Sequence, residues 1–303
     1  MTTTVATSAS LLEAAEEKTG QRVLRLEEST SDNATASIFE GDCLDTLTSK
    51  WVESRSVDLI VTSLPYADQR ASNYGGIKPD DYVEWFLPRA QTLQDCLKED
   101  GSFVLNIEEK AINGEKHPYV YDLVLALRRK QGWRLVDEYC WHKKNCYPGK
   151  WANRFRDSWE RLFHFTINPA FKMRQEAVMV SMGDRQKARL HNLSKTDRIR
   201  DESKHDNGFG KRIENWVGCK MAYPTNVLHM ATECSSKEHP ATFPKALPDW
   251  FIRLFTDKGD MVLDPFAGSG TTLIAALNLE RNAIGIDVSS EYCAKMRKIF
   301  NGS

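Results

Sequence analysis

The sequence predicts an α/β fold with a doubly wound, mostly parallel sheet, because segments with strand and helix patterns alternate through much of its 303 residues. A glycine-rich run, Asp264–Thr272, supports this fold class, since it follows an apolar strand at 261–263 and opens a helical segment at 273–279. The alternation weakens between residues 168 and 237, where basic pairs and glycines indicate an inserted region. We therefore expect one sheet-based domain that carries an insertion.

The expected strands are short apolar segments, at 36–40, 57–62, 102–107, 133–142, 159–166, 261–264 and 283–287. The expected helices lie near 43–50, 80–97, 119–131, 247–256, 271–279 and 289–299. Two of the strands follow each other without a helix, and Pro148 and Gly149 between them indicate a turn. An antiparallel hairpin at the sheet edge is expected there. Residues 1–17 are rich in Ser, Thr and Ala and then acidic, which predicts a tail or a short helix and no secretory signal.

Charge is segregated along the chain. Its 41 Lys and Arg nearly balance 42 Asp and Glu, for a net charge of −1. Residues 142–213 nevertheless hold seventeen basic and eight acidic residues, interleaved with aromatic side chains. This pattern suits phosphate contacts and groove entry in DNA, and the alternative is a solvated loop whose charge serves only solubility.

Composition also argues against several classes of protein. No run of eighteen apolar residues occurs, so no membrane span is expected. The seven cysteines are scattered and form no C-x-x-C pair, which predicts reduced thiols in an intracellular protein, in the cytoplasm or nucleoid if the source is bacterial. The seven histidines show neither H-E-x-x-H nor a Cys/His cluster, so no metal site is expected.

The glycine-rich run has the features of a nucleoside cradle. Gly268 and Gly270 bracket Ser269 at a strand-to-helix turn, where a missing Cβ permits unusual backbone angles and a close ligand. The run contains neither G-x-G-x-x-G nor G-x-x-x-x-G-K-[ST], so it does not predict binding of a pyrophosphate or triphosphate. The next strand ends in Asp287, a carboxylate well placed for ribose hydroxyls. A nucleoside without phosphates fits best.

A second motif lies about two hundred residues upstream, where Ser63-Leu64-Pro65-Tyr66 follows the strand at 57–62. This tetrapeptide resembles the [DNS]-P-P-[YFW] motif of amino-group methyltransferases, and D-P-F-A-G-S-G-T-T resembles their S-adenosylmethionine loop. The tetrapeptide precedes the loop, an order similar to that of the permuted beta class of DNA amino-methyltransferases. The resemblance covers most of residues 36–300, and it implies a Rossmann-like methyltransferase sheet with an inserted DNA-recognition region.

The resemblance implies a role for each motif. The cofactor S-adenosyl-L-methionine would be held by Asp42, Asp264, Phe266, Gly268, Ser269, Gly270, Thr271 and Asp287. The target base would be held by Ser63, Leu64, Pro65 and Tyr66, with the Ser63 hydroxyl and the Leu64 carbonyl accepting from its amine and Tyr66 stacking on the extruded ring. Duplex DNA would contact Trp141, Lys143, Asn145, Arg154, Lys211 and Arg212.

The tetrapeptide departs from the family pattern at Leu64, where proline is usual. A backbone carbonyl remains at this position, but the rigidity that proline confers is expected to be lost. Ser63 at the first position goes in the family mostly with cytosine-N4 methylation, whereas Asp is commoner in adenine-N6 enzymes. We therefore expect a site-specific cytosine-N4 DNA methyltransferase that flips its target base. The alternatives are an adenine-N6 enzyme of the same fold, an RNA or protein methyltransferase, and a catalytically silent DNA-binding protein.

The resemblance also implies a division of the chain into four parts. These are a tail at 1–30, a catalytic half at 31–167, a target-recognition insertion at 168–236 and a cofactor-binding half at 237–303. The expected partner is double-stranded DNA, without a membrane. A cognate restriction endonuclease acting on the same site, a solitary enzyme, a monomer and a homodimer all remain open.

Overall fold

The computed structural model describes residues 14–18, 21–31, 34–49, 51–68, 76–145, 149, 152–193, 217–232 and 243–300. The chain divides into two compact units. The larger unit consists of Met1–Arg174 and Asn226–Ser303, and the smaller unit consists of Gln175–Thr225. Every described residue of the two motifs belongs to the larger unit.

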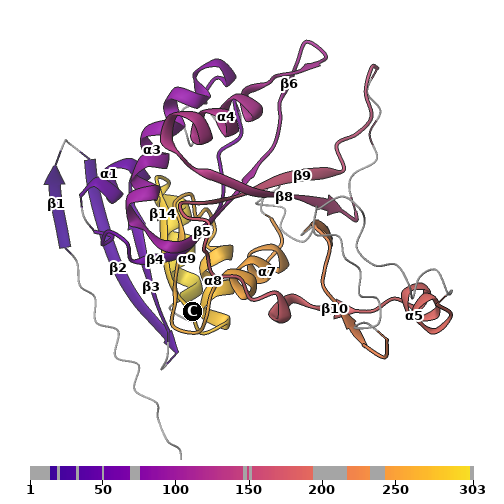
Figure 1. The fold of residues 1–303 in the computed structure, drawn as a ribbon. Coiled ribbons are helices and arrows are strands. Elements are labelled where there is room, and N and C mark those ends of the chain that lie inside the picture. The colour runs from indigo at the N-terminus through magenta and orange to yellow at the C-terminus, as the bar shows by residue number, and fades with distance from the viewer. Residues whose placement is uncertain are drawn as a thin grey trace, which may run out of the picture. The chain divides into compact units, whose positions relative to one another are not determined.

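A ten-stranded sheet forms the centre of the larger unit, in the order β1-β2-β3-β14-β13-β4-β5-β9-β8-β12 (Figure 1). Its middle strands run parallel to one another, and they are β3 (Ala34–Glu40), β14 (Asn282–Asp287), β13 (Met261–Asp264), β4 (Val57–Ser63) and β5 (Leu97–Ile107). Residues 57–62 of β4 are all buried, as is typical of a parallel strand covered on both faces. The predicted mostly parallel α/β sheet is confirmed, and its middle strands share one carboxyl edge.

The predicted hairpin consists of β8 (Arg134–Lys143) and β9 (Trp159–Thr166), which pair antiparallel. Strand β9 also pairs antiparallel with β5, so β8 runs in the same direction as the middle strands. A further strand, β12 (Val227–Met230), pairs parallel with β8 and is the outermost strand on this side. This short strand was not among the expected ones.

Among the first thirty residues, those that the structure describes are strands and not the expected tail or short helix. Strand β1 (Ala14–Lys18) pairs antiparallel with β2 (Gln21–Ser31), and β2 pairs antiparallel with β3. The backbone of β3 therefore has hydrogen-bonded neighbours on both sides, with β14 on the other. The tail assignment was wrong for residues 14–18 and 21–30, because a sequence pattern does not reveal that an open sheet edge is available for pairing.

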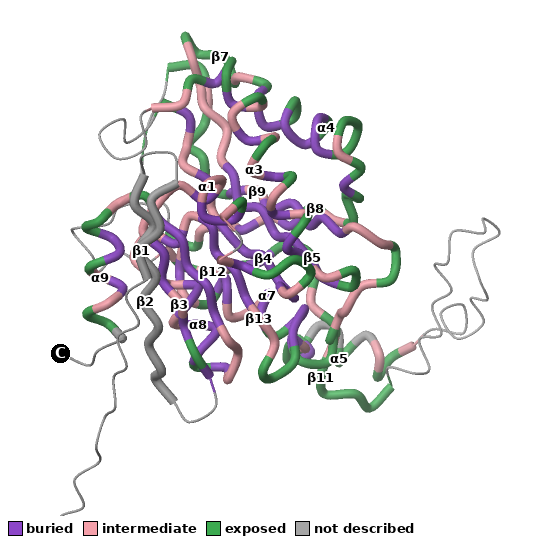
Figure 2. Tube along the Cα trace, turned by 90° about the vertical axis from the view of Figure 1, so that its left-hand side faces the viewer, coloured by how far each residue is buried: buried purple, intermediate pink, exposed green. Residues whose placement is uncertain are grey.

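Helices cover both faces of the sheet (Figures 1 and 2). Helices α1 (Cys43–Thr48), α3 (Tyr82–Cys96) and α4 (Tyr119–Gln131) pack on one face, where their buried side chains join Phe39, Ile60 and Leu105 in one apolar core. Helices α7 (Ala246–Phe255), α8 (Thr271–Asn278) and α9 (Ser290–Phe300) pack on the other face. All six predicted helices form.

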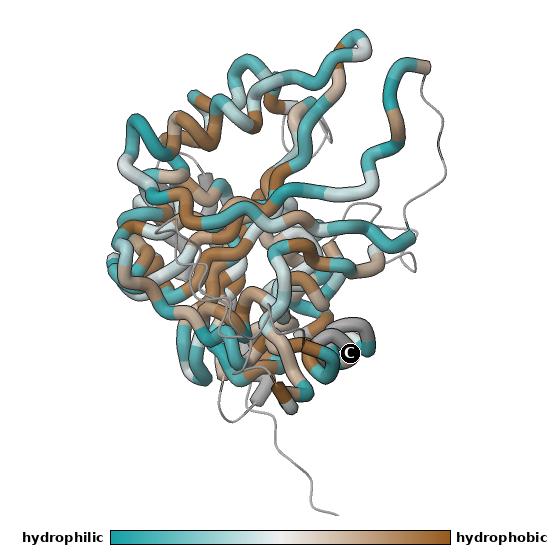
Figure 3. Tube along the Cα trace, turned by 45° about the vertical axis from the view of Figure 1, so that its right-hand side comes forward, coloured by the Kyte–Doolittle hydropathy of each residue, from teal (hydrophilic) through white to brown (hydrophobic). Residues whose placement is uncertain are grey.

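The helices are amphipathic, and hydrophobic residues gather in the strands and on the inner sides of the helices (Figure 3). Helix α7 buries Leu247, Phe251, Ile252 and Phe255 against the sheet, at the spacing of one helix face. Helix α4 ends at Gly132, whose φ of 76° is the left-handed conformation that commonly terminates helices.

The smaller unit contains little regular structure among its described residues. It includes a 3-10 turn (Gln175–Val178), helix α5 (Asp184–His191) and a two-stranded sheet of β10 (Val180–Ser181) and β11 (Met221–Ala222). Its bounds, 175–225, lie inside the range 168–236 that was expected for the insertion. Strand β12 also falls in that expected range, but it belongs to the larger unit.

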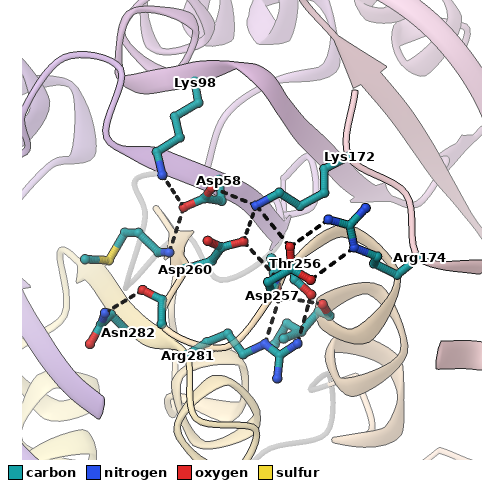
Figure 4. A network of polar contacts seen from close by, with 12 residues as sticks. Asp58, Lys98, Lys172, Arg174, Thr256, Asp257, Asp260, Arg281 and Asn282 are labelled. Carbon is teal, nitrogen blue, oxygen red and sulfur yellow. Dashed lines mark hydrogen bonds and ion pairs between the residues drawn. The ribbon is translucent and has the colours of Figure 1, made fainter. Parts of the chain in front are cut away.

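A network of charged side chains lies at the amino ends of β4, β13 and β14, at the edge opposite the two motifs (Figure 4). Asp58, which is only 3% exposed, accepts hydrogen bonds from Lys98 Nζ at 2.8 Å and from the Met261 amide at 2.9 Å. Lys172 Nζ lies 3.4 Å from Asp58 and also pairs with Asp260. The network fastens neighbouring parallel strands at this end of the sheet.

Asp58→Asn is expected to lower the free energy of unfolding by about 2 kcal/mol, because the buried carboxylate accepts hydrogen bonds from Lys98 and from the Met261 amide, and hydrogen bonds to a charged group contribute about 1.5–3 kcal/mol. Glu280→Gln is the matched control, since Glu280 pairs at 2.6 Å with Lys258 on the surface and such pairs contribute at most about 1 kcal/mol. Chemical denaturation of both variants measures the difference. Equal stabilities for the two variants would contradict a structural role for the network.

Candidate active site

The two sequence motifs meet at the carboxyl edge of the sheet. Ser63 ends β4 and Asp264 ends β13, and these two strands are hydrogen-bonded neighbours. Thr62 Oγ1 donates to Asp264 Oδ1 at 2.6 Å and so joins the tetrapeptide strand to the glycine loop. Asp287 ends the adjacent strand β14, level with Glu40 of β3. Segments about two hundred residues apart thus form one continuous edge.

Asp264 braces the loop from inside the protein. It is 2% exposed, and Thr272 Oγ1 donates to its Oδ2 at 2.6 Å while the Phe266 amide donates to its Oδ1 at 3.1 Å. Burial raises the pKa of this carboxyl to about 6. The side chain therefore fixes the loop and the first turn of α8.

The glycine loop leaves a place for a ligand over Gly268. Gly268 has a φ of 53°, and a Cβ added there would meet no atom within 4 Å. Gly270 has a φ of 85°, and a Cβ there would come within 2.8 Å of the Met296 side chain. The first glycine thus keeps an open face, whereas the second allows α9 to pack closely.

Asp287 fixes the same loop through its backbone. It is 2% exposed, and its two carboxylate oxygens accept from the amides of Gly268 at 2.8 Å and Ser289 at 2.9 Å. Ser269 and Thr271 are half-buried where the loop enters α8.

Asp42 lies at the start of α1, where its Oδ1 accepts from the Leu44 amide at 2.8 Å. Its Oδ2 pairs with Arg89 of α3 at 2.6 Å. The Arg89 guanidinium lies 4.5 Å from the centre of the Trp85 ring, and that ring lies 5.8 Å from the ring of Phe266. An aromatic wall of Trp85 and Phe266 therefore borders the loop. Sequence reasoning missed Arg89 and Trp85, because only the tertiary fold brings α3 here.

Each residue of the tetrapeptide after Ser63 is anchored. The Leu64 amide donates to the Asn106 carbonyl at 3.2 Å, and the Leu64 side chain is buried in the apolar core. Tyr82 Oη donates to the Pro65 carbonyl at 2.6 Å. Proline at position 64 would have no N–H for the bond to Asn106. The expected loss of rigidity is therefore offset by a hydrogen bond that only a non-proline residue makes.

Tyr66 leads to a buried carboxylate that sequence reasoning missed. Tyr66 Oη donates to Glu160 Oε2 at 3.0 Å. Burial and the nearby Glu160 charge hold the pKa of Tyr66 well above its usual range. Glu160 is 5% exposed and also contacts Asn106 Nδ2 at 3.0 Å and Lys143 Nζ at 2.6 Å. The signal in the sequence was an isolated carboxylate within the apolar strand at 159–166.

A small pocket adjoins this carboxylate, lined by Ile107, Glu108, Glu109, Lys116, Asp157, Trp159, Glu160 and Arg161. Burial, followed by the charge of Glu160, raises the pKa of Glu108 to about 7. Glu109 pairs instead with Lys116 at 2.6 Å and with Arg161 at 3.2 Å, and these cations hold its pKa below the usual value against the opposing effect of burial.

The residues expected to contact DNA have varied positions. Trp141 is 3% exposed, and its indole N–H donates to the carbonyl of Met230 in the neighbouring strand β12 at 3.1 Å. The side chain is therefore buried and is not a surface contact. Lys143 pairs with Glu160, and Asn145 bonds to Thr232. Arg154 pairs with Asp157 at 2.5 Å in the loop that follows β8. Lys211 and Arg212 lie outside the described residues.

Among the residues that the structure describes, no group of three or more His, Cys, Asp or Glu side chains is arranged so that it could hold a metal ion. Within the same residues, no helix has the length and apolar character needed to cross a membrane.

The sequence profile of a DNA methylase family, that of the N6/N4 methylases, matches residues 57–298, which include both motifs. The chain belongs to the N6/N4 DNA methylase family. The cofactor of this DNA methylase is S-adenosyl-L-methionine. The open face of Gly268 and the neighbouring Asp287 carboxylate fit such a ligand.

Two similar proteins align with most of this chain. The type II methyltransferase M.PvuII of Proteus hauseri is 30% identical over 283 residues, covering 86% of this chain and 82% of its own. The orphan methyltransferase M.BamHII of Bacillus amyloliquefaciens is 30% identical over 251 residues, covering 78% and 86%.

Solved structures show the same fold. The structure named PvuII DNA methyltransferase (cytosine-N4-specific) has a TM-score of 0.66 at 24% identity, over 90% of this chain and 95% of its own. TTHA0409 of Thermus thermophilus, solved in complex with S-adenosyl-L-methionine, has a TM-score of 0.56 at 22% identity, over 87% and 92%.

Proposed function

We propose that this methylase transfers the methyl group to the N4 amino group of cytosine in duplex DNA, at a specific site and with the base flipped out of the helix. The observation that carries the proposal is Ser63, a neutral hydroxyl at the carboxyl end of β4 beside the strand of the cofactor loop. The related PvuII enzyme, which is named cytosine-N4-specific, supports the same choice of base.

The cofactor is proposed to lie against the open face of Gly268. When bound, it supplies an electrophilic methyl group on a sulfonium sulfur. Asp287 is placed to accept from ribose hydroxyls, and the Trp85–Phe266 wall offers an apolar surface for the adenine ring. Asp42 borders the same region through its pair with Arg89. Asp264 acts through Thr62 and Thr272, as a positioning residue.

The base amine needs activation, because its lone pair is delocalised into the ring. Hydrogen-bond acceptors on both N–H groups increase electron density at nitrogen and stabilise the positive charge that develops during transfer. The Ser63 hydroxyl and the Leu64 carbonyl are proposed as these acceptors. Tyr66 is held by Glu160 and offers a ring face for the extruded base.

The DNA surface is proposed to include the loop that follows β8, because β8 ends at the same edge as β4. Phe155 in this loop is 95% exposed and lies between Arg154 and Arg156, a combination suited to contact with bases and phosphates. The smaller unit, with the basic residues around it, is proposed to read the target sequence. Lys211 and Arg212 are proposed to contact phosphates there.

Nucleoside analysis tests the choice of base. Duplex DNA incubated with the protein and isotope-labelled S-adenosylmethionine is digested to nucleosides and examined by mass spectrometry, with RNA and protein as parallel acceptors. We expect label in N4-methylcytosine alone. Label in N6-methyladenine would leave the fold assignment intact and overturn the choice of base. Adenine is the alternative because adenine and cytosine present a similar N–C–N edge. Label only in RNA or protein, or no label at all, would reject the proposal.

A further inference from the structure

Phe155 has its side chain almost wholly in solvent. It is 95% exposed, whereas Val217, the next most exposed large hydrophobic side chain in the part of the chain that the structure describes, is 54% exposed. Removing an aromatic ring from water is favourable, and such rings usually pack in a core or an interface. The ring of Phe155 is therefore available for contact with a second molecule.

The segment that carries this ring is attached on both sides. Before the ring, Asn153 Nδ2 donates to the Gly114 carbonyl at 3.3 Å. After the ring, Asp157 lies 3.7 Å from Lys116 Nζ. Both partners belong to a small antiparallel hairpin at residues 111–116. The ring therefore projects from a segment that its neighbours in the larger unit hold in place.

The same segment is connected to the tetrapeptide. The Lys143 amide donates to the Ser158 carbonyl at 2.8 Å, and Lys143 Nζ pairs with Glu160 at 2.6 Å. Glu160 in turn accepts from Tyr66 Oη at 3.0 Å. Phe155 precedes Glu160 by five residues, so their Cα atoms are at most about 18 Å apart, roughly half a helical turn of DNA. A duplex whose extruded base meets Tyr66 is therefore within reach of Phe155.

The neighbours of Phe155 favour DNA as the second molecule. Arg154 and Arg156 flank the ring in the sequence, and Asp157 holds Arg154 at 2.5 Å. Guanidinium groups bind phosphates, and an apolar side chain between them can enter a base step and separate the stacked bases. A lone ring between two cations offers far less apolar area than a protein interface needs.

We propose that Phe155 enters the base stack at the position from which the target base is extruded; this proposal rests on the proposed function. Extrusion breaks a base pair and removes the stacking contacts of the neighbouring bases, which costs free energy. The ring of Phe155 replaces those contacts inside the helix, while Tyr66 stacks on the extruded base outside it. Phe155 is thus a positioning residue that stabilises the extruded state and touches neither the cofactor nor the reacting amine.

Two duplexes test the insertion. Each carries one target base, located beforehand in DNA that the wild type methylates, and in the second duplex this base is mismatched, so its extrusion costs less. At saturating cofactor and DNA, the single-turnover rate constant depends on the fraction of complexes whose base is extruded. Phe155→Ala should lower it about tenfold on the matched duplex, toward the lower end of what base–aromatic stacking contributes. On the mismatched duplex the loss should be less than about threefold.

Phe155→Leu and Ile299→Ala are the controls. Leucine also serves as an apolar wedge, so Phe155→Leu should keep at least about a third of the wild-type rate constant on both duplexes. Ile299 is likewise exposed, at 48%, but lies near the end of α9, which runs back from the carboxyl edge, so Ile299→Ala should match the wild type. Thermal unfolding should be unchanged in all three variants, because both positions are exposed.

Equal losses on the matched and mismatched duplexes would overturn the insertion, as would a wild-type rate constant for Phe155→Ala on the matched duplex. Weaker DNA binding at an unchanged rate constant would make Phe155 a surface contact only, and it would also overturn the insertion. If the wild type methylates no DNA in the mapping step, the proposed function itself is rejected and the insertion with it.

Discussion

Gly268→Ala is expected to weaken binding of S-adenosylmethionine at least ~30-fold. Gly268 has a φ of 53°, and the space that a Cβ would enter contains no protein atom within 4 Å. We assign that space to the cofactor, so a methyl group there would collide with the ligand. The substitution also disturbs the amide that donates to Asp287 at 2.8 Å. A ~30-fold loss corresponds to about 2 kcal/mol.

Gly132→Ala separates this effect from backbone strain. Gly132 also has a positive φ, of 76°, and a Cβ there would likewise meet no atom within 4 Å, but it ends α4. Both substitutions should lower stability by about 1 kcal/mol, the cost of a left-handed non-glycine residue. Only Gly268→Ala should lower cofactor affinity, as measured by isothermal titration calorimetry. If the two variants bound the cofactor with equal affinity, the assignment of the cofactor to the open face of Gly268 would be wrong.

Much of the sheet was predictable because its strands are buried on both faces. A strand such as β4 is then an uninterrupted apolar segment, and turns or helices bound it clearly. The predicted alternation of strands and helices corresponds to a mostly parallel sheet, whose carboxyl edge holds both Ser63 and the glycine loop. Strand β12 and the strand pair β1–β2 were not predicted, because these segments form strands by pairing with a neighbouring strand and have no clear strand pattern of their own.

Side-chain partners were harder to predict than positions. Trp141 has the sequence context of a DNA contact, yet β12 covers it. Glu160 stands out in the sequence only as an isolated carboxylate in an apolar strand, and Arg89 has no local signal for function, since their partners Tyr66 and Asp42 come from other segments. Asp264 was predicted at the site, but its two oxygens are directed at Thr62 and Thr272. A sequence pattern indicates which residues reach an edge, and only the packed fold determines where their atoms point.

Leu64 illustrates the same limit. From the sequence, the absence of proline predicted a looser acceptor. In the structure, the Leu64 amide bonds to Asn106 at 3.2 Å and the side chain is buried in the core. The anchoring comes from a strand neighbour, which no comparison of tetrapeptides reveals. A silent DNA-binding protein therefore gains no support from this residue.

Ser63→Ala is expected to have the largest effect on catalysis. The change removes the proposed acceptor for the base amine, while the anchors of Leu64, Pro65 and Tyr66 remain. Loss of one such transition-state interaction costs about 3–4 kcal/mol, a rate loss of roughly 10² to 10³. Ser37→Ala is the matched control, since Ser37 is also half-buried on a parallel strand of the sheet but lies in the middle of β3.

The central claim is that the end of β4 and the glycine loop form one methyl-transfer site. Its most direct test is the single-turnover rate constant for methyl transfer to duplex DNA by the wild type, Ser63→Ala and Ser37→Ala, with cofactor and DNA affinities measured beside it. We expect a loss of at least ~100-fold for Ser63→Ala alone, at unchanged affinities. Transfer by Ser63→Ala at the rate of Ser37→Ala would contradict the claim.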